Sequence, residues 1–187
     1  TRLSRGLGDV YKRQPEPRDP EAGELVISEL MVNPEGVPED TGEWIELYNG
    51  TTDDLILTGL ILGDEGVDGA EVAFSDAVVA AGDFIVLCAS ETDNGGVDCQ
   101  GTYLYQTFGG GFALSNSADE VVITSGAGVV LDSMRYSEGS APAGQSIGAP
   151  AGCLDAASND AASCWCPQSG SLSSGDAGTP GGSNSGC

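Results

Sequence analysis

The chain has 187 residues, of which 29 are acidic and 6 are basic, so its formal net charge is −23. A surface this negative repels phosphate backbones and anionic lipids, which argues against a nucleic-acid partner. The sequence contains no histidine, which removes the commonest general base, the commonest metal ligand and any Ser-His-Asp arrangement. No stretch approaches the roughly 18 apolar residues of a membrane-spanning helix, so no membrane span is predicted.

The first residues differ in composition from everything that follows. Residues 1–14, TRLSRGLGDVYKRQ, are basic, whereas the remainder is acidic. They resemble a translated sequencing adapter of the kind found in metagenomic assemblies, so we expect a non-native leader; a genuine basic tail is the alternative. The true N-terminus and any signal peptide would then be missing. Residues 15–23 are rich in proline and predict a linker.

From Glu24 onward, short apolar runs alternate with clusters of Gly, Asn and Asp. This pattern is typical of an antiparallel β-sandwich, and no segment shows a helical period. The predicted strands are residues 24–32, 43–49, 55–64, 71–74, 84–90, 112–115, 120–125 and 129–136. Residues 124–130 predict a tight hairpin between the last two. We therefore predict one all-β domain over residues 24–137.

The stretch GEWIELYNG, residues 42–50, raises the question of catalysis. Strand alternation directs Ile45 and Leu47 to the core, and Glu46 to an opposite face that a loop or the C-terminal tail partly covers. Glu43 and Glu46 could suggest the two carboxylates of a glycosidase. Because they stand three apart on a strand, they point to opposite faces and cannot flank one bond. The interpretation favoured is a structural strand.

Asp132 lies among apolar residues of the last predicted strand. It could be a buried ligand or a buried acid. The favoured interpretation is that it accepts hydrogen bonds from backbone N–H groups or from Ser133.

The six cysteines predict disulfides and an oxidising compartment, because C-x2-C spacing and histidine are both absent and a zinc set could not be completed. A metal site or a catalytic thiol is the alternative. Six cysteines allow 15 pairings. Sequence proximity favours Cys88–Cys99, Cys153–Cys164 and Cys166–Cys187. The expected localisation is secreted or at the cell surface.

Residues 138–187 form an extension rich in Gly, Ala, Ser and Pro. A flexible linker is the default interpretation of such a composition. Because the extension holds four cysteines and Trp165, we expect part of it to be stapled back onto the sandwich. GTPGG, residues 178–182, predicts a type II turn.

No cofactor is expected, although two acidic loops could supply oxygen ligands for Ca2+. Neither loop has the spacing of an EF-hand, so a solvated acidic loop is the favoured interpretation and calcium binding is the alternative. The candidate ligands are Glu91, Asp93 and Asp98 in one loop, or Asp64, Glu65 and Asp68 in the other.

Several segments, in order, carry a family resemblance. They are VISELMVNP, GEWIELYN, LTGLILGD, FALSNSADEVVITSGAGVVLDSMRY and GTPGGSN. Together they resemble the lamin tail domain of bacterial secreted proteins, an immunoglobulin-like β-sandwich, from about Glu24 to Tyr136, with a weaker extension to Asn184. The family often has an aromatic residue where this chain has Leu60, so packing there is expected to differ.

The resemblance implies a role but no reaction. Bacterial lamin tail domains occur in secreted or surface proteins, often beside nucleases or phosphatases, and are usually taken to be binding or anchoring units without established catalytic residues. We therefore expect a non-catalytic module of a larger bacterial extracellular protein, with an extracellular protein or surface ligand as partner. A carboxylate- or calcium-dependent extracellular hydrolase is the alternative. No heptad helix is present, so a nuclear lamina role is not implied.

Overall fold

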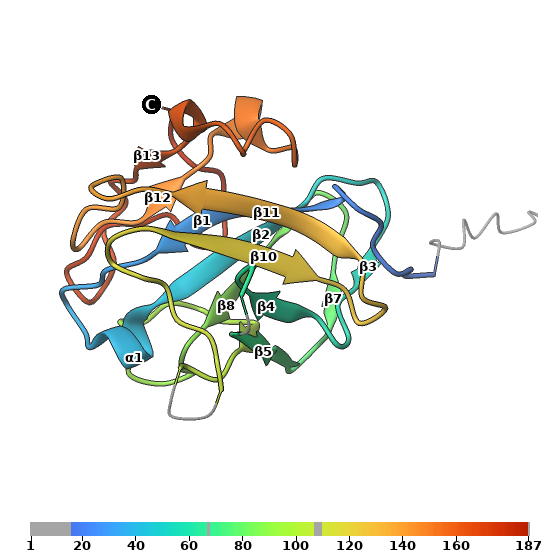
Figure 1. Ribbon diagram of the computed structural model, residues 1–187, viewed down its shortest axis with the longest axis horizontal. Coiled ribbons are helices and arrows are strands. Elements are labelled where there is room, and N and C mark those ends of the chain that lie inside the picture. Colours follow the sequence, from blue (N-terminus) through green and yellow to red (C-terminus); the bar gives the residue numbers. More distant parts are fainter. Residues whose placement is uncertain (1–15, 67, 107–109, 187) are drawn as a thin grey trace, which may run out of the picture.

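Two β-sheets pack face to face with the hydrophobic core between them (Figure 1). The computed structural model describes residues 16–66, 68–106 and 110–186. The predicted leader, residues 1–14, lies outside them. The architecture is the predicted immunoglobulin-like β-sandwich, antiparallel except where β8 and β9 pair in parallel.

The larger sheet has the strand order β13-β12-β1-β2-β8-β9-β6. Its strands are β1 (Leu25–Met31), β2 (Trp44–Asn49), β6 (Ala73–Phe74), β8 (Phe84–Cys88), β9 (Gly101–Thr102), β12 (Ile147–Gly148) and β13 (Cys166–Pro167). A four-residue helix, α1 (Glu39–Gly42), leads into β2.

The smaller sheet has the order β11-β10-β4-β5, and a separate two-stranded pair joins β3 to β7. These strands are β3 (Leu55–Ile56), β4 (Ile61–Gly63), β5 (Gly69–Glu71), β7 (Val78–Val79), β10 (Asp119–Thr124) and β11 (Val130–Tyr136). The predicted hairpin between β10 and β11 is confirmed, with Gly128 at a φ of +82°.

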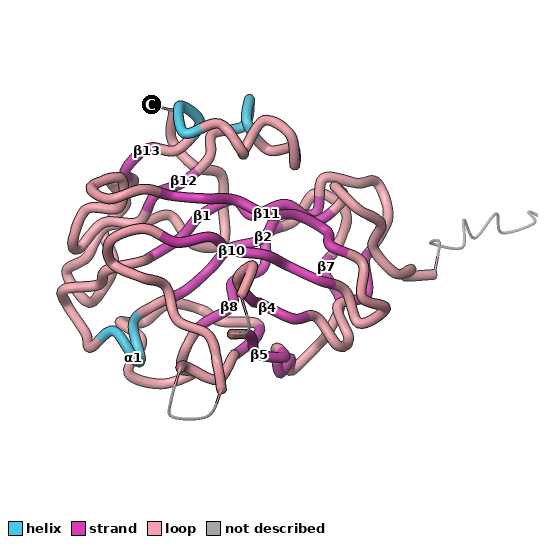
Figure 2. The backbone as a smooth tube through the Cα atoms, viewed as in Figure 1, coloured by secondary structure: helices cyan, strands magenta, loops and turns pink. Residues whose placement is uncertain are grey.

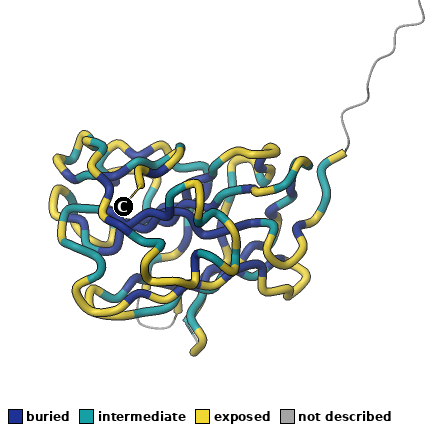
Figure 3. Tube along the Cα trace, turned by 90° about the horizontal axis from the view of Figure 1, so that it is seen from above, coloured by how far each residue is buried: buried dark blue, intermediate teal, exposed yellow. Residues whose placement is uncertain are grey.

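The core is built by alternate side chains of both sheets, and the buried strands run through the middle of the molecule in Figure 3. Ile45 and Leu47 of β2 belong to this main cluster, as predicted. Trp44, on the opposite face of β2, belongs to a second cluster with Met31 and Val86. The larger sheet is therefore covered on both faces.

A β-bulge in β1 reverses its alternation. Ile27 pairs with Leu47, and the next register pair is Glu29 with Glu46, so β1 advances two residues while β2 advances one. A bulge adds one residue to one strand and changes the face that later side chains occupy. Ile27 therefore points into the core, whereas Glu29 shares the outer face with Glu46.

One predicted strand, residues 55–64, is wrong as a continuous element. It divides into β3 and β4, because Gly59 has a φ of +75° and the Leu60 N–H bonds to the Leu57 carbonyl in a turn. The turn was not predicted because residues on both sides of it in the 55–64 run are apolar.

Two further predicted strands differ in the structure. Residues 71–74 divide between β5 and β6, which lie in different sheets, at Val72. Residues 112–115 form only an isolated bridge from Phe112 to Tyr105. Short apolar runs of this kind do not distinguish a strand from an extended loop.

The C-terminal extension lies against the larger sheet rather than extending away from it. Its strand β12 pairs with β1, and β13 pairs with β12. Two short 3-10 helices, Ala151–Cys153 and Ala162–Cys164, stand between them. Figure 2 shows that loops make up most of this region.

Candidate functional site

Five acidic side chains are buried among the described residues, and they form the most unusual chemistry of the fold. They are Glu29, Glu43, Glu46, Asp132 and Asp176. A buried carboxyl group is costly unless hydrogen bonds or a cation compensate the loss of water. The partners of each carboxyl therefore indicate what it does.

Glu29 is fully buried beneath the segment of residues 178–184, which we call the C-terminal strap. Its Oε1 accepts hydrogen bonds from the Ser146 hydroxyl and, at 2.8 Å, from the Thr179 N–H. Its Oε2 lies 2.9 Å from the Thr179 hydroxyl. Burial raises the pKa of Glu29 above its ordinary value, although these hydrogen bonds oppose the shift.

Glu46 is the neighbour of Glu29 across the strands and is also fully buried. Its Oε1 accepts from the Ser28 hydroxyl at 2.7 Å, and its Oε2 accepts from the N–H groups of Gly181 at 2.6 Å and Gly182 at 3.3 Å. Burial raises the pKa of Glu46 to about 8, and the carboxyl of Glu29 adds to the rise. Glu46 thus lies on the face covered by the tail, as the strand alternation predicted.

The strap can approach this closely because its turn is rich in glycine. Gly181 has a φ of +84°, a conformation that favours glycine. A Cβ at Gly178 would lie 3.0 Å from the Trp44 ring and 3.3 Å from the Glu29 carboxyl. A side chain at Gly178 would therefore crowd Trp44 and Glu29, and one at Gly181 would strain the left-handed backbone.

Glu43 lies on the other side of the sheet from Glu46. Its Oε2 accepts from the Leu114 N–H at 2.8 Å, and the Tyr105 hydroxyl lies 3.5 Å from its Oε1. Burial raises the pKa of Glu43 to about 8. Glu43 and Glu46 have entirely different surroundings, in agreement with the prediction that they point to opposite faces.

Asp132 on β11 joins the two sheets and the extension. Its Oδ2 accepts from the Ile27 N–H at the β1 bulge at 2.8 Å and from the Asn159 side chain at 2.6 Å. Burial raises the pKa of Asp132 to about 6. The predicted role as an acceptor of backbone N–H groups is confirmed. Asp132 is the acceptor for the Ile27 N–H at the β1 bulge.

Asp176, in the extension, holds the loop that follows β1. Its Oδ1 accepts from the N–H groups of Glu35 at 3.0 Å and Gly36 at 2.9 Å. All five buried carboxyls therefore accept a main-chain N–H from a different segment of the chain. In every case the carboxyl fixes a loop, a bulge or the strap in place.

The disulfides staple two further loops. Cys88 is joined to Cys99, and Cys153 to Cys164. Cys166 is also disulfide-bonded; its predicted partner, Cys187, lies outside the described residues. The first two bonds are the pairs that sequence proximity favoured.

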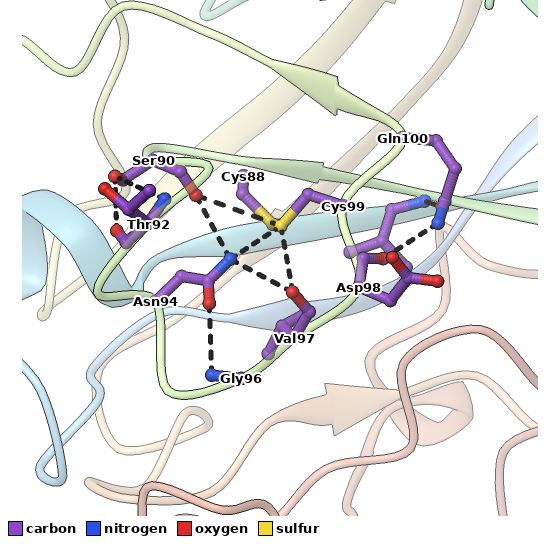
Figure 4. The surroundings of a disulfide bond; sticks show 10 residues. Cys88, Ser90, Thr92, Asn94, Gly96, Val97, Asp98, Cys99 and Gln100 are labelled. Atoms are coloured by element: carbon purple, nitrogen blue, oxygen red, sulfur yellow. Dashed lines mark hydrogen bonds between the residues drawn. A yellow bond between two sulfur atoms is a disulfide. The ribbon is translucent and has the colours of Figure 1, made fainter. Parts of the chain in front are cut away.

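The loop of the first disulfide, one of the two predicted calcium loops, is organised by an amide rather than by its acids. Figure 4 shows the Asn94 side chain at its centre. Asn94 donates to the carbonyl oxygens of Ser90 at 3.2 Å and Val97 at 3.0 Å, and accepts from the Gly96 N–H at 3.0 Å. The three candidate calcium ligands here, Glu91, Asp93 and Asp98, are exposed.

The acids of the second predicted calcium loop have separate partners. Asp64 accepts from the Gly66 N–H at 2.6 Å, and Glu65 forms an ion pair with Arg135. Asp68 accepts from the Gln106 side chain at 2.7 Å. Among the residues described, no group of three or more His, Cys, Asp or Glu side chains is arranged to hold a metal ion. Calcium binding at either loop remains a prediction.

Sequence reasoning missed Glu29 as the neighbour of Glu46, and it missed Ser146 and Thr179 as the partners of Glu29. GTPGG was visible as a turn, but nothing in the sequence states that it lies over two carboxyl groups. The signal that could have drawn attention to Glu29 is its place in an apolar run whose alternation breaks at Ser28.

The fold defines the class of the protein: it is an immunoglobulin-like β-sandwich, and hydrogen bonds to buried carboxyl side chains hold its loops in place. The sequence profile of the Lamin Tail Domain family matches residues 18–138. The chain therefore belongs to the lamin tail domain family, as the resemblance predicted. A search of curated proteins found no match to it. In the described part of the chain, no helix is long and apolar enough to cross a membrane.

Proposed function

We propose that this domain is a non-catalytic binding or anchoring module, secreted or displayed at the cell surface as part of a larger bacterial extracellular protein. Membership of the lamin tail domain family supports a binding or anchoring role. The disulfides support an oxidising compartment.

One observation carries the non-catalytic part of the proposal. Each buried carboxyl, including the adjacent pair Glu29 and Glu46, accepts main-chain N–H groups of its own fold. A glycosidase needs two carboxyl groups that reach a substrate from solvent. Glu29 and Glu46 have no exposed surface, because the strap covers them. The role of these two carboxyls is therefore to bind the strap through hydrogen bonds.

The alternative, a carboxylate- or calcium-dependent hydrolase, is tested by assaying the chain on plasmid DNA and on nitrophenyl esters, glycosides and phosphates, with Ca2+ or Mg2+. Glu43→Gln and Glu46→Gln serve as matched variants, and a mock purification sets the background. We expect no turnover above the mock. Turnover that the wild type shows and either variant loses would establish the hydrolase instead.

A shallow groove at one end of the sandwich is the surface that we propose for a partner. It has a volume of about 720 Å3 and is lined by apolar Ile56 and Val129 together with acidic Asp19 and Glu21. Val129 is 41% exposed and the adjacent Val130 52%. This chemistry suits a partner segment that carries an apolar side chain beside a Lys or Arg.

Two synthetic peptides test the groove: one places Lys beside a central Leu run, and the other replaces each Lys with Glu. Chemical-shift perturbation should locate the Lys peptide at Ile56 and Val129, and Val129→Asp should remove the effect. Equal shifts from both peptides would show that Asp19 and Glu21 do not select a basic partner, and shifts elsewhere on the domain would place the binding surface outside the groove.

A further inference from the structure

The Thr179 hydroxyl lies between two oxygen atoms that both need a hydrogen. Its Oγ1 is 2.9 Å from Glu29 Oε2 and 2.6 Å from Asn184 Oδ1. A hydroxyl carries one hydrogen and can donate it to only one acceptor at a time in good geometry. An ionised carboxylate and an amide oxygen are both acceptors without a hydrogen of their own.

The orientation of Asn184 is fixed by its other contacts. Its Nδ2 donates to the carbonyl oxygens of Ser28 at 2.8 Å and Ala149 at 3.2 Å. Exchanging the amide oxygen and nitrogen would place an acceptor against two carbonyls and lose both bonds. The Asn184 atom that faces Thr179 is therefore an oxygen.

The contacts are one hydrogen short if Glu29 is ionised. We propose that folded Glu29 carries a proton on Oε2, and that this proton locks the C-terminal strap onto the sandwich. The chain of hydrogen bonds then runs from Glu29 Oε2–H to Thr179 Oγ1, and from the Thr179 O–H to Asn184 Oδ1. The proton belongs on Oε2 because Oε1 already accepts from Ser146 and the Thr179 N–H.

The donors around the two carboxyls show that Glu29, rather than Glu46, must supply the missing hydrogen. Glu46 receives one hydroxyl and two main-chain N–H groups, a set that is complete for an ionised carboxylate. No contact of Glu46 requires a hydrogen from the carboxyl itself.

The surroundings of Glu29 also favour its neutral form. Glu46 is the titratable group that faces it from β2. The strap has the sequence GTPGGSN and β12 contributes Ile147 and Gly148, so neither element brings a titratable or cationic side chain. Burial raises the pKa of Glu29 in the same direction. Ionisation of Glu29 would place a negative charge beside the buried Glu46 carboxyl and leave the contact with Thr179 without a hydrogen, which weakens the hold on the strap.

The test is a titration of the full chain, with the Glu side chains labelled with 13C at the carboxyl carbon and observed by NMR. Glu29→Gln assigns the Glu29 signal. We expect Glu29 to remain protonated at pH 7, far above the ordinary glutamate pKa of about 4.3. When Glu29 ionises, the hydrogen-exchange protection factors of the Thr179, Gly181 and Gly182 amides should fall by at least about tenfold, the scale of one hydrogen bond to a charged group.

Two variants separate the proton from the surrounding structure. Glu29→Gln retains an N–H that can donate to Thr179, so its strap should stay protected at alkaline pH. Glu46→Gln, the matched control on the neighbouring strand, should keep the pH-dependent loss of protection. Glu29 ionised at pH 7 in the wild type, or its ionisation without any change in strap protection, would overturn the proposal. Once Glu29→Gln has assigned the signal, the wild-type titration decides this by itself.

Discussion

Glu29 on β1 and Glu46 on β2 are register partners with no exposed surface. Each accepts a main-chain N–H from the C-terminal strap, Glu29 from Thr179 150 positions later and Glu46 from Gly181 135 positions later, rather than pairing with a cation. Two neighbouring acids in a chain of net charge −23 would repel each other if both were ionised. Their burial is tolerated because the strap supplies donors and because burial favours the neutral form. The strap and the acids therefore depend on each other.

Stability should fall as the pH rises from about 5.5 to about 8.5. The folded pKa values of Glu43 and Glu46 are raised to about 8. Between the unfolded value of about 4.3 and the folded value, the folded state binds more protons, so the free energy of unfolding decreases with pH. A pKa difference of one corresponds to about 1.4 kcal/mol, and 1 kcal/mol to about 2–4 °C in Tm at this chain length. Calorimetry should show a Tm at least about 5 °C lower at the higher pH; an equal or higher Tm there would contradict the account.

Removing the Glu46 carboxyl should destabilise the fold through the donors that it leaves behind. Glu46→Ala leaves the Ser28 hydroxyl and the Gly181 N–H without their acceptor in a buried site, where each unsatisfied group costs about 1–3 kcal/mol. We expect a loss of about 2–4 kcal/mol in urea unfolding. Glu71→Ala on β5 is the control, because Glu71 is exposed. A similar loss of stability in both variants would show that the buried hydrogen bonds of Glu46 do not stabilise the fold.

Asp132 should be required for the junction of β1 and β11. Asp132→Ala removes the acceptor of the Ile27 N–H and of Asn159, and we expect a loss of about 2–3 kcal/mol. Asp132→Asn should cost less, since it keeps an oxygen for the Ile27 N–H. Ser133→Ala, at the exposed neighbouring position, should change the free energy of unfolding by less than about 0.5 kcal/mol. If Asp132→Ala unfolds at the same urea concentration as Ser133→Ala, the bulge does not need this carboxyl.

The two disulfides should differ in their contribution although both have a sequence separation of 11. In the chain-entropy picture, equal separations give similar contributions of about 2–4 kcal/mol. Cys88 is fully buried and packs with Trp44 and Val86, so replacing both Cys88 and Cys99 with Ala also leaves a cavity. The variant without Cys153–Cys164 should therefore be the more stable of the two by about 1 kcal/mol or more in thermal or urea unfolding. The reverse order would mean that the extension, rather than the second cluster, depends most on its disulfide.

The sequence predicts the regular part of the fold because alternation survives there. The strands β2, β10 and β11 follow alternating runs, and β1 follows a long apolar run that a bulge interrupts. The turn at Gly59 was not predictable, because an apolar run continues on both sides of it. The strands β12 and β13 have two residues each, too few for a period.

The position of a site residue was predictable only where the alternation of a single strand determines which face its side chain occupies. The covered face of Glu46 follows from the alternation of β2 alone. The place of Glu29 depends on a bulge, and its partner Thr179 lies 150 positions away. Such contacts arise from the packing of the whole chain, which no local pattern encodes.

The extension is an integral part of the domain, because it supplies partners of the buried acids Glu29, Glu46 and Asp132. The most direct measurement compares urea unfolding of the full chain with that of a chain ending at residue 138, where the family match ends. The shortened chain loses the partners of Glu29 and the Asn159 amide of Asp132. We predict that it shows no cooperative unfolding and little dispersion in its amide NMR spectrum. A shortened chain that unfolds cooperatively, with a free energy within about 1 kcal/mol of the full chain, would contradict the account.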